Sequence, residues 1–194
     1  AALIAKDKQY IWHPFTQMQD WLGEEPVIVD SADGVHLVDT LGNRYLDGVS
    51  SLWCNVHGHR VPEIDEAIRV QLGKVAHSTL LGLASTASIE CAQVIAAVVP
   101  RGLTRVFFSD AGATAVEIAL KIAFQFWTNQ GVTGRTRYLA FGGAYHGDSI
   151  GSLSVGDGGF GTDVFDPLRF PVLRAPSLSE PGAVDAAVAL IEAH

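Results

Sequence analysis

Apolar and polar positions in the first 100 residues predict a small hairpin followed by two helices. Residues 27–47 read VIVDSADGVHLVDTLGNRYLD, with strand-like spacing on both sides of a turn at 41–43, which is typical of an antiparallel hairpin. Residues 62–75 begin with a proline, which suits a first helical turn, and their apolar residues recur on one helical face. Residues 88–99 predict another helix, which Pro100 ends.

From residue 105 the pattern changes to strand, turn and helix. RVFF at 105–108 predicts a short buried strand, 109–114 predict a turn, and 115–127 predict a helix. A second short strand, RYLAF at 137–141, leads into a glycine-rich turn at 142–148. Strands that alternate with helices indicate an α/β fold with a parallel sheet. Ligands of such sheets bind at the carboxyl ends of the strands, where both turns fall.

The last residues predict one more helix. It begins near Ser179 and Pro181 and runs to His194 without a stop signal. We therefore expect the sequence to end inside or just after an element and not at a finished domain edge, so that the α/β domain is incomplete.

Composition and charge narrow the function. The 194 residues suffice for one substantial core, and 48% hydrophobic with 18% charged residues is normal for a globular domain. A net charge of −8, with no cluster of Lys or Arg, argues against nucleic acid or an anionic membrane as partner and favours small molecules or other proteins. Two cysteines and no long apolar run favour a cytoplasmic protein.

The first glycine-containing turn has the features of an anion site. In FFSDAGATAVEIALK, an apolar strand passes through Gly112 into a helix, whose first backbone N–H groups and dipole favour a phosphate, and Thr114 can add a hydroxyl. The spacing is equally consistent with an ordinary helix N-terminus capped by Ser109 or Asp110. The segment is not a Walker loop, because no Gly-Lys-Ser/Thr follows.

The second turn, GGAYHGD at 142–148, places Tyr145, His146 and Asp148 among glycines. Glycine adds no buried area and costs conformational entropy, so a turn of this kind is unexpected in a core. It suits a planar ligand that lies close to the backbone against the Tyr145 ring. The alternative is a loop tyrosine that packs on its own domain.

Two further groups favour structural roles. Lys121 has the chemistry of a nucleophile, but Glu117 lies four residues earlier on the same helix, and this spacing favours an ion pair on the polar face. WCNVHGHR at 53–60 contains a cysteine and two histidines, with His77 further on, but their spacing is not that of a structural zinc site. We therefore expect no metal.

Five blocks of the sequence resemble the class III, fold-type I aminotransferases, which depend on pyridoxal 5′-phosphate. In chain order they are WHPFTQM (12–18), DGVSSLWCNVHGH (47–59), AHSTLLG (76–82), FFSDAGATAVEIALKIAFQFW (107–127) and AYHGDSIGSLSV (144–155). Five blocks in the family's order make the resemblance specific, whereas any one of them alone would be weak. Within the family they look like the members that convert 8-amino-7-oxononanoate to 7,8-diaminononanoate in biotin synthesis.

The resemblance implies roles for named residues. The cofactor phosphate would lie on Gly112, Ala113 and Thr114, and Tyr145 would stack on the pyridine ring. Many relatives have serine or threonine at the position of Ala113, so we expect one side-chain hydrogen bond to be missing here. The residues that would contact the substrate are Phe15, Leu52, Trp53, Tyr145 and Asp148.

The resemblance also implies an architecture. Residues 1–60 would form an N-terminal segment with the small hairpin, part of the small domain and of the substrate channel. Residues 61–194 would form the first part of the large cofactor-binding domain, with a parallel-type sheet and flanking helices. The Schiff-base lysine of the family lies downstream of the position that matches His194, so we expect no catalytic residue in residues 1–194 and no activity from them alone. The full-length form would be a homodimer.

The resemblance leaves the amino donor open between two compounds. Family members that use S-adenosylmethionine have a tyrosine in the first block and two adjacent tryptophans in the second, where this sequence has Phe15, Leu52 and Trp53. A branch that uses lysine resembles the sequence more closely in PFTQM, NVHGHR and AHSTLLG. The alternatives to this function are another class III ω-amine aminotransferase, and a chain that binds phosphate compounds or a partner subunit without turnover.

Overall fold

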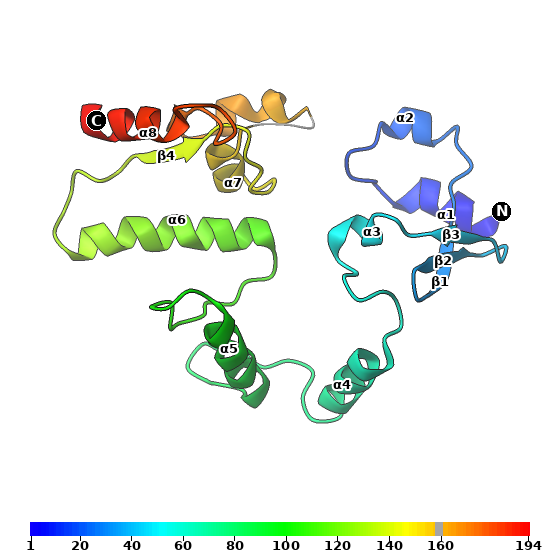
Figure 1. Ribbon diagram of the computed structural model, residues 1–194. Helices are drawn as coiled ribbons and strands as arrows, with labels where there is room; N and C mark the ends of the chain where they lie inside the picture. The colour runs from blue at the N-terminus through cyan, green and yellow to red at the C-terminus, as the bar shows by residue number, and fades with distance from the viewer. Residues whose placement is uncertain (158–160) are drawn as a thin grey trace. The chain divides into compact units, whose positions relative to one another are not determined.

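The computed structural model describes residues 1–157 and 161–194, which form two compact units, Ala1–Gln93 and Val94–His194. The first unit contains an antiparallel sheet and the second a parallel one (Figure 1). Helix α5 (Thr86–Val98) runs across the residue at which the units divide. The domain boundary predicted at residue 60 stays a prediction.

The first unit is built on a small sheet with short helices before and after it. Its three strands pair in the order β1-β2-β3, and in the second pairing His36 lies opposite Leu46 and Val38 opposite Arg44. The predicted hairpin is therefore confirmed, with a third strand added to it. The elements that precede α5 are α1 (Ala2–Tyr10), α2 (Met18–Trp21), β1 (Val29–Asp33), β2 (His36–Asp39), β3 (Arg44–Leu46), α3 (Ser50–Trp53) and α4 (Pro62–Leu72).

One carboxylate organises the turn between β2 and β3. Asp39 accepts hydrogen bonds from the backbone N–H groups of Leu41 (2.9 Å) and Asn43 (2.8 Å), the Asn43 amide (2.9 Å) and the Tyr45 hydroxyl (2.9 Å). These bonds, led by the one from the Asn43 side chain, lower the pKa of Asp39 to about 2. Gly42 occupies the left-handed position, with φ of +85°. The turn predicted at 41–43 is confirmed.

A second carboxylate connects the two short helices at the N-terminus. Asp7 in α1 accepts hydrogen bonds from Trp21 Nε1 (2.8 Å) and His13 Nε2 (2.9 Å), and the rings of His13 and Trp21 lie 4.2 Å apart. Neither α1 nor α2 was predicted. The apolar residues of α1 do not gather on one helical face, and the four residues of α2 are too few to show a period. The two helices predicted in this part of the chain are confirmed. The helix predicted at 62–75 is α4, which ends before Gly73, and the helix predicted at 88–99 is α5.

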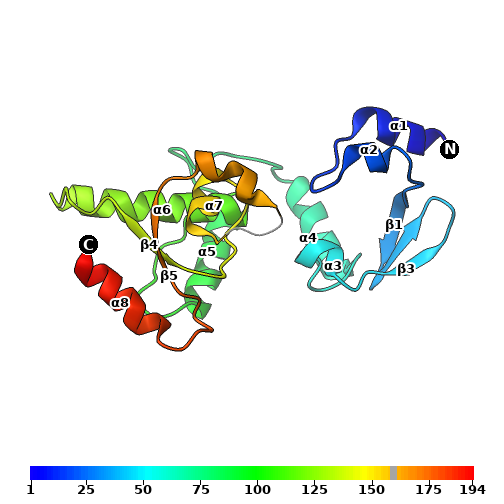
Figure 2. The same cartoon turned by 90° about the horizontal axis from the view of Figure 1, so that it is seen from above.

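The second unit is an α/β arrangement around two parallel strands. Tyr138 lies opposite Val172 and Phe141 opposite Ala175, which confirms the predicted parallel sheet. Helix α7 contacts β4 and packs on α6, while α8 contacts both strands from the other side (Figures 1 and 2). The elements are α6 (Gly112–Asn129), β4 (Tyr138–Phe141), α7 (Ile150–Val155), the 3₁₀ helix η1 (Thr162–Leu168), β5 (Val172–Ala175) and α8 (Ala183–Ala193).

The buried core of this unit is made largely of small side chains. In α7 every residue from 151 to 155 is buried, and Ala175, Ala183 and Ala187 are buried on β5 and α8. Small residues allow close backbone approach, so α7 can lie against its neighbours over its whole length. This helix fixes the turn that precedes it, which is the predicted aromatic turn.

The prediction of a strand at 105–108 is wrong. The segment has the composition of a strand, but it pairs with no strand in the described part of the chain. Phe107 is 67% exposed. Valine and phenylalanine favour a strand, but a strand forms only where a neighbouring backbone accepts and donates its hydrogen bonds. The strand predicted at 137–141 is confirmed as β4.

Candidate functional site

The N-terminus of α6 presents unpaired backbone donors to open space. The first N–H of this end with a helical partner is that of Ala115, which bonds to the Ala111 carbonyl at 2.9 Å. Among the described residues, the N–H groups of Gly112, Ala113 and Thr114 have no acceptor. A Cβ atom on Gly112 would meet nothing within 4 Å. Free donors and the dipole of an 18-residue helix together favour an anion here.

The hydroxyl of Thr114 is engaged within the turn. Its oxygen accepts the Ala111 N–H at 3.0 Å, and the same oxygen lies within donating distance of Asp110 Oδ1 (2.7 Å) and of the Ala111 carbonyl oxygen (2.9 Å). The bond from Thr114 lowers the pKa of Asp110, which stays ionised. The N-cap is Ala111, so the alternative of a Ser109 or Asp110 cap is wrong. An anion at this end would therefore be held by backbone N–H groups.

The glycine-rich turn after β4 is tied to the segments that follow it. Gly142 donates its N–H to the Ala175 carbonyl at 2.8 Å, and Gly143 donates to Asp157 Oδ2 at 2.6 Å. Asp157 in turn donates its own N–H to the Ala144 carbonyl at 2.9 Å. Gly143 has φ of +69°, a conformation that glycine adopts without a steric penalty. The turn is thus held at the carboxyl end of the parallel sheet.

The two glycine-containing turns are in direct contact. Gly147 has φ of +113°, and a Cβ atom placed on it would lie 2.5 Å from Ala113 Cβ and 2.9 Å from Ala113 Cα. No side chain fits at this position without moving one turn away from the other. The glycine is therefore required by close packing of protein on protein, whereas the sequence suggested only close approach to a ligand. The N-terminus of α6 and the turn of Tyr145 consequently form one surface.

Glu117 joins α6 to the beginning of α7. Its Oε1 accepts hydrogen bonds from the Ser149 hydroxyl (2.6 Å) and the Gly151 N–H (2.8 Å), and a Cβ atom on Gly151 would overlap the carboxylate. A negative charge at a helix N-terminus is favourable. The predicted ion pair with Lys121 is wrong, because among the described residues the Glu117 carboxylate bonds to α7 and forms no ion pair.

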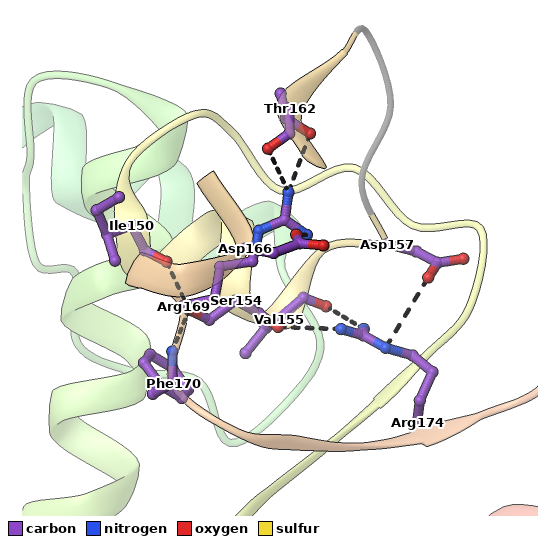
Figure 3. Close-up of polar contacts among 9 residues, drawn as sticks. All are labelled: Ile150, Ser154, Val155, Asp157, Thr162, Asp166, Arg169, Phe170 and Arg174. Carbon is purple, nitrogen blue, oxygen red and sulfur yellow. Dashed lines mark hydrogen bonds and ion pairs between the residues drawn. The ribbon is translucent and has the colours of Figure 1, made fainter. Parts of the chain in front are cut away.

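Two arginines fix the other end of α7 and the chain beyond it (Figure 3). Arg174 on β5 donates to the carbonyls of Val155 (2.8 Å) and Ser154 (3.0 Å), which are the last of the helix. A cation at a helix C-terminus satisfies these carbonyls and complements the dipole. Arg169 donates to the carbonyl (3.1 Å) and hydroxyl (3.0 Å) of Thr162. Helix α7 is therefore anchored at both ends.

Tyr145 and Asp148, predicted as separate site residues, form a pair. The tyrosine hydroxyl donates to Asp148 Oδ2 at 2.7 Å, and this bond is the main cause that raises the pKa of Tyr145 above its usual range. Tyr145 is 50% exposed, and Asp148 is also exposed. The tyrosine is thus neutral at physiological pH, with a ring whose direction is set by a carboxylate.

The other three predicted substrate residues belong to the first unit. Phe15, Leu52 and Trp53 are all exposed, and each has positive φ. Leu52 and Trp53 lie in α3 (Ser50–Trp53), which is a four-residue left-handed turn with φ angles of 51°, 49°, 62° and 72°. Left-handed conformation costs a residue with a Cβ about 1–2 kcal/mol. Sequence reasoning missed this turn because no glycine marks it.

No metal centre or membrane span is found in the described residues. No group of three or more His, Cys, Asp or Glu side chains there is arranged to hold a metal ion. His59, one of the predicted candidates, bonds instead to Asp47 at 2.8 Å. None of the helices described is long and apolar enough to cross a membrane.

Comparison with known proteins links the chain to one family. The family model for aminotransferase class III matches residues 18–181. The adenosylmethionine-8-amino-7-oxononanoate aminotransferase of Nitratidesulfovibrio vulgaris is 61% identical over 179 residues, which are 91% of the chain and 33% of that protein. The enzyme of the same name from Geobacter sulfurreducens is 47% identical over 171 residues, 88% of the chain and 38% of the relative. The chain thus spans about a third of the length of these two relatives.

Two solved structures share the fold. The crystal structure of adenosylmethionine-8-amino-7-oxononanoate aminotransferase from Methanocaldococcus jannaschii matches with a TM-score of 0.94 at 43% identity, over 100% of this chain and 44% of the other. An (S)-enantioselective ω-transaminase from Thermomicrobium roseum matches with a TM-score of 0.85 at 32% identity, over 99% of this chain and 45% of the other. Both matches confirm the α/β fold class.

The contact between the two turns predicts a specific sensitivity at Gly147. In the full-length protein, Gly147→Ala should destabilise by about 1–3 kcal/mol through overpacking on Ala113, in addition to the cost of positive φ. Gly131→Ala is the matched control, because Gly131 has φ of +75° but open space where a Cβ would lie. Urea unfolding followed by circular dichroism measures both. Equal destabilisation by the two substitutions would contradict the contact.

Proposed function

The chain belongs to the class III aminotransferases, and from this premise we propose that the full-length protein is a pyridoxal 5′-phosphate-dependent aminotransferase that converts 8-amino-7-oxononanoate to 7,8-diaminononanoate. The observation that carries the proposal is the contact of Gly147 with Ala113, which joins an anion-binding helix end to an exposed aromatic side chain. A phosphate joined to a flat ring needs these two features side by side. The names of the two relatives and of the M. jannaschii enzyme supply the reaction.

The residues present fit the phosphate of this cofactor. Gly112 and Ala113 offer backbone N–H groups, and the space in front of Gly112 is open. Ala113 has no hydroxyl, and that of Thr114 is held by Asp110 and Ala111, so the phosphate would rely on backbone donors. When bound, the cofactor supplies a ring that withdraws electrons from the carbon next to the reacting nitrogen.

Tyr145 and Asp148 would serve the ring and the substrate. The half-exposed Tyr145 ring can lie on a pyridine face, and its bond to Asp148 restricts the ring to one direction. The Asp148 carboxylate is exposed beside it and would attract the ammonium group of an amine substrate. Phe15, Leu52 and Trp53 would supply an apolar wall for the carbon chain of the substrate.

The proposal includes a homodimer in the cytoplasm as the working form. Exposed thiols at Cys54 and Cys91 suit a reducing compartment. Small-molecule acceptor and donor are the expected partners, in keeping with the acidic net charge of −8.

A second function is supported by one finding. The T. roseum ω-transaminase shares the fold at 32% identity, so another class III ω-amine aminotransferase remains the alternative reaction. The amino acceptor distinguishes the two functions. The first enzyme would act on a keto acid that already carries an amine, whereas the second would act on a wider range of ketones or aldehydes.

The activity itself is the first test. Purified full-length protein with pyridoxal 5′-phosphate and 8-amino-7-oxononanoate should form 7,8-diaminononanoate, measured by mass spectrometry, with S-adenosylmethionine or lysine as donor. Residues 1–194 alone should show no turnover above the free cofactor, because none of their lysines matches the cofactor-binding lysine of the family. Amination of other acceptors only would favour the second function, and no amination of any acceptor would refute both.

The amino donor is predicted from two substitutions in the apolar wall. Phe15 has no hydroxyl and Leu52 no indole face, whereas a sulfonium cation and an adenine ring suit aromatic surfaces. Lysine should therefore be the better donor, and Phe15→Tyr/Leu52→Trp should shift kcat/KM toward S-adenosylmethionine, by about 10-fold if each contact contributes a fraction of a kcal/mol to about 1 kcal/mol.

Donor kinetics on the wild type and on the double variant test this directly. If S-adenosylmethionine is the better donor in the wild type, or if the ratio does not move in the variant, positions 15 and 52 do not select the donor.

A further inference from the structure

The turn of Ser50–Trp53 is held in its conformation by the carboxylate of Asp47. Four consecutive residues with Cβ atoms have φ between 49° and 72°, which L-residues adopt only when surrounding contacts fix them. Asp47 Oδ1 accepts the Ser51 N–H at 2.8 Å, and Oδ2 accepts the Ser51 hydroxyl at 2.8 Å. The carbonyl of Ser50 accepts the N–H groups of Cys54 and Asn55, both at 3.0 Å.

His59 is the second partner of this carboxylate. Its Nε2 lies 2.8 Å from Asp47 Oδ2, and the side chains of His59 and Asp47 are only 13% and 5% exposed. The His59 backbone is fixed on the turn between β1 and β2, where its N–H bonds to the Gly34 carbonyl at 2.7 Å and its carbonyl accepts the Gly34 N–H at 3.2 Å. The sheet, His59, Asp47 and the strained turn thus form one continuous chain of hydrogen bonds.

Within the described residues, the large side chains of the turn are exposed and are not what holds it. In the described chain Leu52 is 66% and Trp53 68% exposed. Glycine would form the same turn without the steric penalty, yet none of the four residues is glycine. The hydrogen bonds of a buried carboxylate therefore hold a strained turn from which two large apolar side chains point outward in fixed directions.

We propose that Asp47 and His59 are positioning residues, which set the directions of Leu52 and Trp53 and through them the affinity for the amine donor. The proposal rests on the function proposed above, in which these two side chains form part of the substrate wall. It also gives a defined role to His59, one of the two histidines at 53–60.

Kinetics of the full-length enzyme test the role. Asp47→Asn keeps the size of the side chain but loses one acceptor and the charge, and it should raise KM for the donor by on the order of 10-fold to 100-fold while changing kcat much less. His59→Gln should act in the same direction. Asp39→Asn is the matched control: Asp39 is another carboxylate of this unit that accepts backbone and side-chain hydrogen bonds in a turn, but it lies at the end of β2 away from Gly34 and His59, so donor KM should not change.

Glycine rescue separates positioning from general stability. Ser50→Gly removes the steric cost of positive φ at one position of the turn, so Asp47→Asn/Ser50→Gly should recover part of the lost donor affinity. An unchanged donor KM in folded Asp47→Asn would overturn the proposal, and so would a failure of the glycine variant to recover any affinity.

A measurement without turnover keeps the inference distinct from the proposed function. The emission of Trp53, obtained as the difference between proteins with and without Trp53→Phe, should be quenched more by acrylamide in Asp47→Asn than in Asp39→Asn. If the wild type shows no aminotransferase activity but this difference is found, the proposed function fails and the positioning of Trp53 stands. Identical quenching in the two variants would refute the positioning role.

Discussion

Glu117 reaches from α6 to the beginning of α7, where it accepts hydrogen bonds from the Ser149 hydroxyl and the Gly151 N–H. Its carboxylate occupies the space that any side chain at 151 would need. Because α7 follows directly on the turn at 142–148, this interaction presses Gly147 against Ala113. The distance between the proposed phosphate donors and Tyr145 depends on it. Arg174 has the complementary role at the other end of α7, so the short helix is fixed by a negative charge at its beginning and a positive charge at its end.

Elements with long apolar periods or clear stop signals could be predicted from the sequence. Helices α4, α5 and α6 and strand β4 lie within a few residues of their predicted bounds, because proline, glycine or a full helical period marks them. Strand β5 was missed because it has only four residues and contains a charged one, Arg174. In the structure this arginine donates to the last carbonyls of α7. The segment 105–108 shows the opposite failure: its composition is that of a strand, but pairing depends on a neighbouring backbone that spacing does not reveal.

Some residues of the candidate site also have a local sequence signal, and others do not. Gly112 and Tyr145 could be named as candidates because a glycine before a helix and an aromatic residue among glycines are local signals. Glu117 was assigned to Lys121 by their spacing, yet the N–H groups at the beginning of a buried helix need an acceptor more than an exposed lysine needs a partner. The left-handed turn at 50–53 was missed because it contains no glycine. Its contact with Asp47 is local, through Ser51, whereas only the fold brings His59 to the same carboxylate.

The central claim is that the two turns form a single site for a phosphate and a flat ring. A crystal structure of the full-length protein with pyridoxal 5′-phosphate tests it most directly. The account predicts phosphate oxygens within about 3.2 Å of the backbone nitrogens of Gly112 and Ala113, with the Tyr145 ring lying on the pyridine face. A phosphate bound away from the N-terminus of α6, or a Tyr145 ring turned away from the cofactor, would contradict it.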